Sequence, residues 1–150
     1  MGNNGSKPRR RSDDDVIEVD ASLSEVVKEE LQACRLVLVH LDRAGNLQRL
    51  YLNSNKLTAL PDAIGQLTSL NTLELRYNQL TALPDAFGQL TSLKCLKLEG
   101  NQLTALPSTF CLLTGLEYLY LSNNQLTALP DTFGLLTSLK ELDLGDNQLT

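Results

Sequence analysis

The chain has 150 residues, a formal net charge of −5 at pH 7, and 42% hydrophobic but only 5% aromatic residues. This length suits one domain, and leucine must supply most of its core. Nucleic-acid binding is disfavoured because phosphate contacts need clustered Lys and Arg, and we expect neither a signal peptide nor a membrane span because no early or long apolar run is present.

Residues 1–20 are predicted to be a disordered tail in which a basic block precedes an acidic block. The first six residues match the N-myristoylation pattern M-G-x-x-x-[ST], which makes Gly2 a candidate lipidation site. One acyl chain binds a membrane weakly, and Lys7 with Arg9, Arg10 and Arg11 would add electrostatic attraction. The alternatives are a chance match in a disordered segment, or a nuclear-localisation patch.

Ser12 directly follows three arginines, a pattern that resembles a site for a basophilic kinase. A phosphate there would add roughly −1.5 to −2 charge beside the arginines, and we expect it to release the tail from a membrane.

Residues 21–46 are predicted to form an N-terminal cap. Ser22 and Glu25 have the spacing of a capping box, and an apolar stripe then continues at helical spacing to Cys34. The apolar stretch 35–41 predicts a strand, and residues 42–46 have the composition of a turn. A helix and a strand here would cover the first repeat of the array that follows.

Residues 47–150 form an array in which the phrase L-x-x-L-x-L-x-x-N-x-L recurs every 23 residues, from Leu47, Leu70, Leu93, Leu116 and Leu139. The central x-L-x-L-x predicts short strands near residues 49–53, 72–76, 95–99, 118–122 and 141–145, with leucines inward and variable residues outward. An asparagine follows each predicted strand, at Asn55, Asn78, Asn101, Asn124 and Asn147. We expect its side-chain amide to form hydrogen bonds with backbone groups that are left unpaired where the chain turns.

The segment returning from each strand also repeats, beginning as TALPDAIGQLTSL. Its prolines are expected to open a short helical turn: Pro61, Pro84, Pro107 and Pro130. An apolar column follows, consisting of Ile64, Phe87, Phe110 and Phe133. The next residue is predicted to break the turn, as Gly65, Gly88 and Gly134, with Cys111 in the remaining unit.

These units, with x-L-x-x-L-P-x-x-[IF]-G-x-L-x-x-L after the Asn, resemble the intracellular leucine-rich-repeat proteins of the Ras-associated type. That group includes Ras-binding scaffolds, plant intracellular Ras-group repeats and the Scribble and Erbin scaffolds. The resemblance implies an α/β fold, a right-handed horseshoe solenoid with a parallel β-sheet on its concave face and short helical turns on its convex face. It also implies an adaptor that binds another protein through the concave face, often in small-GTPase or phosphatase signalling.

The sequence stops at Thr150 directly after a predicted strand. The last unit would then expose the leucines on its open side, Leu139, Leu142, Leu144 and Leu149. Either the chain is a fragment of a longer protein or this end pairs with something, and we favour the fragment.

The outward strand positions and the residues just beyond them form the candidate partner-binding surface. It comprises Arg49, Tyr51, Asn53, Thr72, Glu74, Arg76, Tyr77, Cys95, Lys97, Glu99, Tyr118, Tyr120, Ser122, Glu141 and Asp143. All four tyrosines of the chain fall here, and Tyr is favoured at interfaces because it offers a large area with a polar tip. Basic residues lie toward the start of this surface and acidic residues toward its end. The plainer interpretation is that β-propensity favours Tyr on strands and the charges only solvate the face.

The sequence indicates no catalytic residue, cofactor site, metal site or small-molecule substrate. The glycines recur once per unit and form no phosphate loop, and His40 is the only histidine. Cys34 and Cys111 fall on apolar patterns and are predicted to be core, whereas Cys95 lies at an outward position. Three cysteines without paired spacing favour a reducing compartment, so we expect a cytoplasmic protein, peripheral on a membrane if Gly2 is acylated.

Three functional interpretations follow: a protein-interaction module of a scaffold, the recognition arm of a larger kinase, cyclase or ubiquitin ligase, and a repeat protein without a specific partner.

Overall fold

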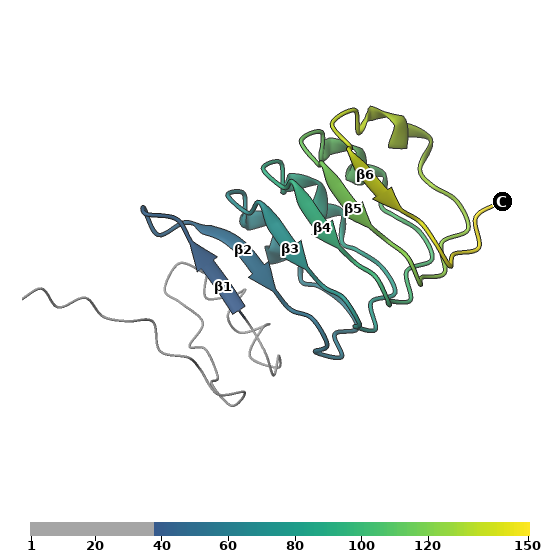
Figure 1. Ribbon diagram of the computed structural model, residues 1–150, viewed down its shortest axis with the longest axis horizontal. Helices are drawn as coiled ribbons and strands as arrows, with labels where there is room; N and C mark the ends of the chain where they lie inside the picture. The colour runs from purple at the N-terminus through teal and green to yellow at the C-terminus, as the bar shows by residue number, and fades with distance from the viewer. Residues whose placement is uncertain (1–37) are drawn as a thin grey trace, which may run out of the picture.

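The computed structural model describes residues 38–150 as a solenoid with a single sheet along one side (Figure 1). Strand order follows the sequence: β1 (Leu38–Leu41), β2 (Leu47–Tyr51), β3 (Thr72–Glu74), β4 (Cys95–Lys97), β5 (Tyr118–Tyr120) and β6 (Glu141–Asp143). β1 pairs antiparallel with β2, and every later pair is parallel. Most strands are shorter than the predicted ranges, and β2 starts earlier, because it also pairs with β1.

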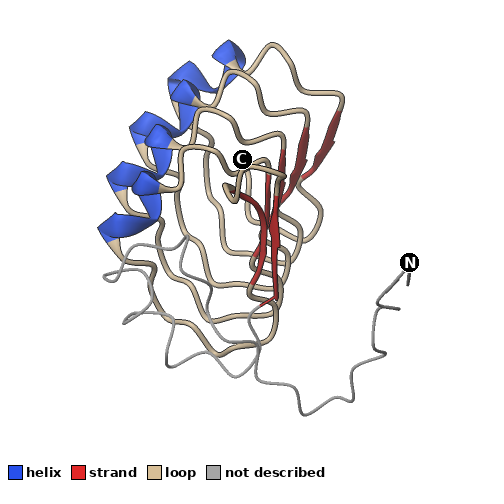
Figure 2. Ribbon diagram, turned by 90° about the vertical axis from the view of Figure 1, so that its left-hand side faces the viewer, coloured by secondary structure: helices blue, strands red, loops and turns tan. Residues whose placement is uncertain are grey.

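Four 3₁₀ helices occupy the opposite side of the solenoid, where Figure 2 shows them in a row behind the sheet. They are η1 (Asp62–Gln66), η2 (Asp85–Gln89), η3 (Ser108–Leu112) and η4 (Asp131–Leu135). Each begins directly after a proline in an extended or near-extended conformation, and three of them have an aspartate in the first turn. The predicted helical turns and their starting points are therefore confirmed.

The core lies between the sheet and the 3₁₀ helices. The two inward leucines of each inner strand segment are fully buried, as Leu73 and Leu75 illustrate. On the helix side Phe87 and Phe110 are fully buried and stack with ring centroids 6.2 Å apart and planes 6° from parallel. Burying one such side chain stabilises the fold by roughly 1.5–3 kcal/mol, so the repeated column supplies much of the driving force.

The repeated asparagines join each unit to the one before it. Asn101 is buried, and its Nδ2 donates to the carbonyls of Leu75, 2.9 Å away, and of Leu98, 3.0 Å away. Its Oδ1 accepts the backbone N–H of Leu80 at 3.1 Å. Asn78, Asn124 and Asn147 make equivalent bonds. The prediction that these amides satisfy the turning backbone is confirmed, and two of the three bonds cross to the preceding unit.

The prediction for the repeated glycines is wrong. Gly65 and Gly88 lie inside their 3₁₀ helices and do not end them. A Cβ at Gly65 would lie 2.6 Å from the Ala86 carbonyl oxygen, and one at Gly88 would lie 2.5 Å from that of Thr109. Glycine is needed because the next turn of the solenoid approaches this closely.

The last unit is covered on one side only within the described residues. Leu142 and Leu149 are 40% and 38% exposed, whereas their equivalents Leu119 and Leu126 are fully buried. Leu139 and Leu144 are partly buried. The predicted exposure of the last unit is therefore confirmed for Leu142 and Leu149.

The predicted strand of the N-terminal cap is confirmed in part, as β1. The tail, the helix of the cap, Gly2, Ser12 and Cys34 lie outside the described residues. No helix within residues 38–150 is long and apolar enough to cross a membrane.

Candidate functional site

The outward positions of β2 to β6 form two rows across the sheet. Strand register places Arg49, Thr72, Cys95, Tyr118 and Glu141 in one row, and Tyr51, Glu74, Lys97, Tyr120 and Asp143 in the other. We call this surface, together with the residues that directly follow the strands, the concave face. The residues of each row, which the 23-residue period predicts to be equivalent, are therefore neighbours in space.

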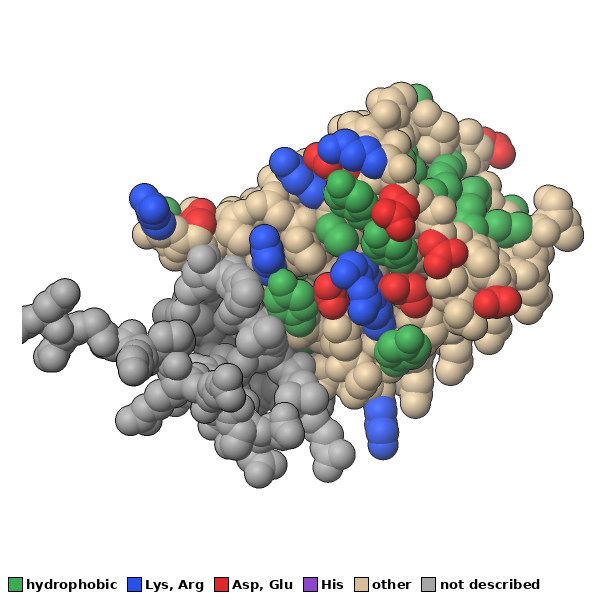
Figure 3. All heavy atoms as spheres, in the orientation of Figure 1, with side chains coloured by type: hydrophobic (Ala, Val, Ile, Leu, Met, Phe, Trp, Pro, Cys, Tyr) green, Lys and Arg blue, Asp and Glu red, His purple; other side chains and the backbone are tan. Residues whose placement is uncertain are grey.

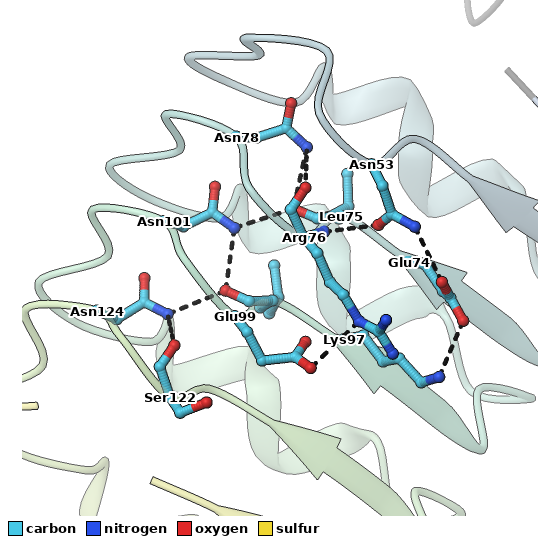
Figure 4. Close-up of polar contacts among 11 residues, drawn as sticks. Asn53, Glu74, Leu75, Arg76, Asn78, Lys97, Glu99, Asn101, Ser122 and Asn124 are labelled. Atoms are coloured by element: carbon cyan, nitrogen blue, oxygen red, sulfur yellow. Dashed lines mark hydrogen bonds and ion pairs between the residues drawn. The ribbon is translucent and has the colours of Figure 1, made fainter. Parts of the chain in front are cut away.

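Ion pairs hold the middle of the concave face (Figure 4). Lys97 Nζ lies 3.0 Å from Glu74 Oε1, and Arg76 Nε lies 3.2 Å from Glu99 Oε1. Asn53 Nδ2 donates to Glu74 Oε2 at 2.9 Å. Burial alone would raise the pKa of Glu74, but the bonds from Asn53 and Lys97 outweigh it and lower the pKa. Glu74 is therefore anionic at neutral pH, and these side chains are fixed in advance of any binding.

The ion pairs change the expected charge gradient. Arg76 and Lys97 were predicted to make the start of the face basic, but each is neutralised by a glutamate of a neighbouring unit. Arg49, on β2, is exposed and forms no ion pair among the residues described. Figure 3 shows the mixed charges at the centre of the face and acidic side chains toward the β6 end.

Tyr77 follows β3 at an edge of the concave face and has an unusual backbone conformation. Its φ is 54°, in the left-handed region, as are those of the equivalent Ser54, Asn123 and Asp146. Such a conformation costs a bulky residue roughly 1–2 kcal/mol, whereas Asn and Asp tolerate it better. Tyr77 is 67% exposed, and its ring lies over Gly100, where a Cβ would approach Tyr77 Cδ1 to 2.6 Å. An exposed aromatic ring is thus maintained at a backbone cost.

Tyr118 and Tyr120 lie side by side with the carboxylates of β6. Register pairs Tyr118 with Glu141 and Tyr120 with Asp143. Burial, followed by a hydrogen bond to Glu141, raises the pKa of Tyr120, so its hydroxyl is protonated at neutral pH. Lys97 Nζ lies 5.9 Å from the centroid of the Tyr120 ring. The two rings form a half-buried aromatic area at the centre of the last three strands.

Neither described cysteine has the surroundings of a nucleophile. Burial is the main cause that raises the pKa of the Cys95 thiol, which keeps it protonated and unreactive. Cys111 is half-buried, contrary to the prediction that it is core, and its Sγ contacts the Ser108 carbonyl at 3.1 Å. Within residues 38–150, no group of His, Cys, Asp or Glu side chains has a geometry that could hold a metal ion.

The convex face carries two exposed leucines that were not predicted from the sequence. Leu112 and Leu135 are 53% and 55% exposed, at the positions that Gln66 and Gln89 occupy in the earlier units. The change from Gln to Leu within an otherwise constant return segment was the available signal.

A one-sided parallel sheet built from such units, backed by 3₁₀ helices and joined by buried asparagines, defines a leucine-rich-repeat solenoid. The family model described as leucine rich repeat matches residues 45–103 and 103–149, and the chain belongs to this family. The Ras-associated subtype stays a resemblance. No curated protein sequence matches the chain significantly.

Several solved structures are similar to the chain. A leucine-rich-repeat protein of Leptospira interrogans is 48% identical, with a TM-score of 0.68 over 70% of this chain and 27% of that one. A chain of the BIR3–SERK2 complex from Arabidopsis thaliana is 28% identical, with a TM-score of 0.66 over 76% of this chain and 63% of that one. A chain of the PEPR1–AtPEP1 structure is 31% identical, with a TM-score of 0.65 over 74% of this chain and 16% of that one. This chain therefore spans less than two thirds of each.

Proposed function

We propose that this chain is a protein-interaction module that binds a partner protein through its concave face. The observation that carries the proposal is the organisation of that face. Ion pairs between units fix Glu74 and Lys97, and beside them two tyrosine rings stand outward on β5. Packing of the core does not require these residues, and a surface fixed in advance loses less entropy when it binds.

Relatives support the proposal at the level of the fold. Leucine-rich-repeat domains generally mediate protein–protein interaction, and two of the similar structures are named as BIR3–SERK2 and PEPR1–AtPEP1. For this chain we propose the narrower role of an adaptor in intracellular signalling, with a small GTPase or a phosphatase as partner. That narrower role rests on the resemblance of its 23-residue units to Ras-associated repeats.

A second candidate function is the recognition arm of a larger signalling enzyme, such as a kinase, cyclase or ubiquitin ligase. The observation that favours it is that this chain spans only 27% and 16% of two similar chains. An open reading frame that continues into a catalytic domain in the native transcript would support this function. A stop codon directly after Thr150 would remove it.

Replacing Tyr120 by alanine is expected to weaken binding to the partner at least about tenfold, because central aromatic residues dominate interface energetics. The partner would first be captured from the native source with the full chain as bait and identified by mass spectrometry. Affinity would then be measured by isothermal titration calorimetry with the intact chain and with Tyr120→Ala.

Gln125→Ala is the matched control for this measurement, because Gln125 is exposed and lies outside the two rows of the concave face. It should leave the affinity unchanged. Equal affinity for all three proteins, with melting temperatures also equal, would show that the concave face is not the binding surface.

We also propose that the chain is cytoplasmic and attaches peripherally to a membrane through a myristoylated Gly2. The N-terminal peptide isolated from eukaryotic cells should then carry the mass of a myristoyl group, and Gly2→Ala should lose both this mass and membrane partition. Ser12→Asp should reduce partition while keeping the acyl group, because added negative charge opposes the arginines. An unmodified Gly2 would refute the anchor, and unchanged partition of Ser12→Asp would refute the switch.

A further inference from the structure

Charge is compensated unevenly along the concave face. In the middle, the carboxylates of Glu74 and Glu99 each have a cation from a neighbouring unit. On and just after β6, among residues 38–150, neither Glu141, Asp143 nor Asp146 forms an ion pair with Lys or Arg. Lys140 is the nearest basic residue in sequence, and it is already paired with Glu117 at 2.5 Å. The β6 end therefore presents negative charge that the described part of the chain does not neutralise.

Aromatic rings border these carboxylates. Tyr118 and Tyr120 stand on β5 in register with Glu141 and Asp143, and neighbouring strands lie about 4.8 Å apart. The ammonium of Lys97 already lies near the ring of Tyr120, at 5.9 Å from its centroid. That ammonium is tied to Glu74 and is not available to the β6 carboxylates.

We propose that the β5–β6 end of the concave face binds a basic segment of the partner protein, with an Arg or Lys side chain over the Tyr118 and Tyr120 rings and paired with Glu141 or Asp143. The inference rests on the proposed function and adds the chemistry of the partner. A cation within about 6 Å of a tyrosine centroid is attracted by the ring face, and one strand spacing brings a carboxylate within reach of the same cation. Arginine fits best, because its planar guanidinium stacks on an aromatic ring while its N–H groups bind a carboxylate.

The two rows also give the bound segment a direction. Arg49, on β2, is exposed at the opposite end of the face. Four strand spacings separate β2 from β6, or about 19 Å, and an extended chain covers this distance in about six residues. A segment with a basic residue at one end and an acidic residue about six positions away therefore complements both ends of the face.

The test uses the full chain and two fluorescein-labelled twelve-residue peptides. One carries three arginines spaced by Gly and Ser, and the other carries glutamates in their place. Fluorescence anisotropy at low salt should show binding of the arginine peptide only. Glu141→Gln with Asp143→Asn should weaken that binding about tenfold, since neither position then carries a carboxylate that can pair with an arginine. The substituted side chains keep an oxygen, so the bond from the Gly145 N–H to Asp143, 3.0 Å long, is retained.

Asp62→Asn with Asp85→Asn is the matched control on the convex side. Either double substitution removes two carboxylates and changes the formal net charge from −5 to −3. The control should reduce the affinity less than twofold. Equal losses in the two double variants would overturn the inference, because attraction would then follow net charge alone. Tyr118→Leu should lower the affinity for the arginine peptide more than the affinity for an otherwise identical lysine peptide. If Tyr118→Leu and the intact chain bound the arginine peptide with equal affinity, the inference would also be overturned.

The captured partner separates this inference from the proposed function. Binding that is lost in Tyr120→Ala but unchanged in Glu141→Gln with Asp143→Asn would leave the concave face as the binding surface and refute the basic segment. Binding that is unchanged in Tyr120→Ala would refute the proposed function itself.

Discussion

Replacing Asn101 by alanine is expected to lower the free energy of unfolding by about 2–4 kcal/mol, because one buried N–H loses its partner, at a cost of about 1–3 kcal/mol, and two buried carbonyls each lose one of their two hydrogen bonds. The three groups are the N–H of Leu80 and the carbonyls of Leu75 and Leu98. The two carbonyls keep the bonds that Asn78 and Asn124 donate to them. Two of them belong to the preceding unit, so the change also weakens the coupling between units on which a solenoid depends.

Urea unfolding followed by circular dichroism measures this effect. Gln102→Ala is the control, because Gln102 is the next residue and its side chain is exposed. We expect the control to change stability by less than about 0.5 kcal/mol, as for an ordinary surface substitution. If Asn101→Ala were as stable as the control, the buried amide would have no part in holding the units together.

Replacing Gly88 by alanine is expected to lower the free energy of unfolding by about 2–3 kcal/mol, which is toward the upper end for an overpacked site. The new Cβ would lie 2.5 Å from the carbonyl oxygen of Thr109 and 2.8 Å from the Cβ of Thr109, so η2 and η3 must separate. The atoms that clash belong to backbone and to a short side chain, which have little freedom to move aside.

Gly134→Ala provides a matched comparison, because Gly134 is the equivalent residue in η4 and a Cβ there meets nothing within 4 Å. Its φ also lies outside the left-handed region, so alanine should be neutral or should stabilise the fold by up to about 1 kcal/mol. Thermal unfolding of the two variants would separate the two explanations. Equal destabilisation would mean that glycine is required for turn conformation, as the sequence first suggested, and not for the approach of the next turn.

One unit of the array has Cys111 in place of this glycine. It stands in η3 at the position of Gly65 and Gly88, and the following helix, η4, has no buried residue in the described structure. Phe133 is also only partly buried, whereas Phe87 and Phe110 are fully buried. Two differences coincide at η4, the Cβ of Cys111 on one side and no further turn of the described chain on the other.

The sequence by itself determined the solenoid, the outward rows and the inward leucines, because a fixed period of 23 residues forces equivalent residues into equivalent places. The buried asparagines followed for the same reason, since an amide that turns the chain once must do so in every unit.

The variable residues obey no period, so their partners could not be read in the same way. The pairing of Lys97 with Glu74 and of Arg76 with Glu99 depends on side-chain direction across neighbouring units, and it neutralises two of the cations expected to make the early strands basic. Only the tertiary structure decided that glycine is needed at position 88 because the next turn of the solenoid approaches it, and not because of the conformation of its own turn. It also decided that Tyr77 has a left-handed backbone conformation and that its ring lies over Gly100. Both findings depend on distances between residues of neighbouring units, which lie far apart along the chain.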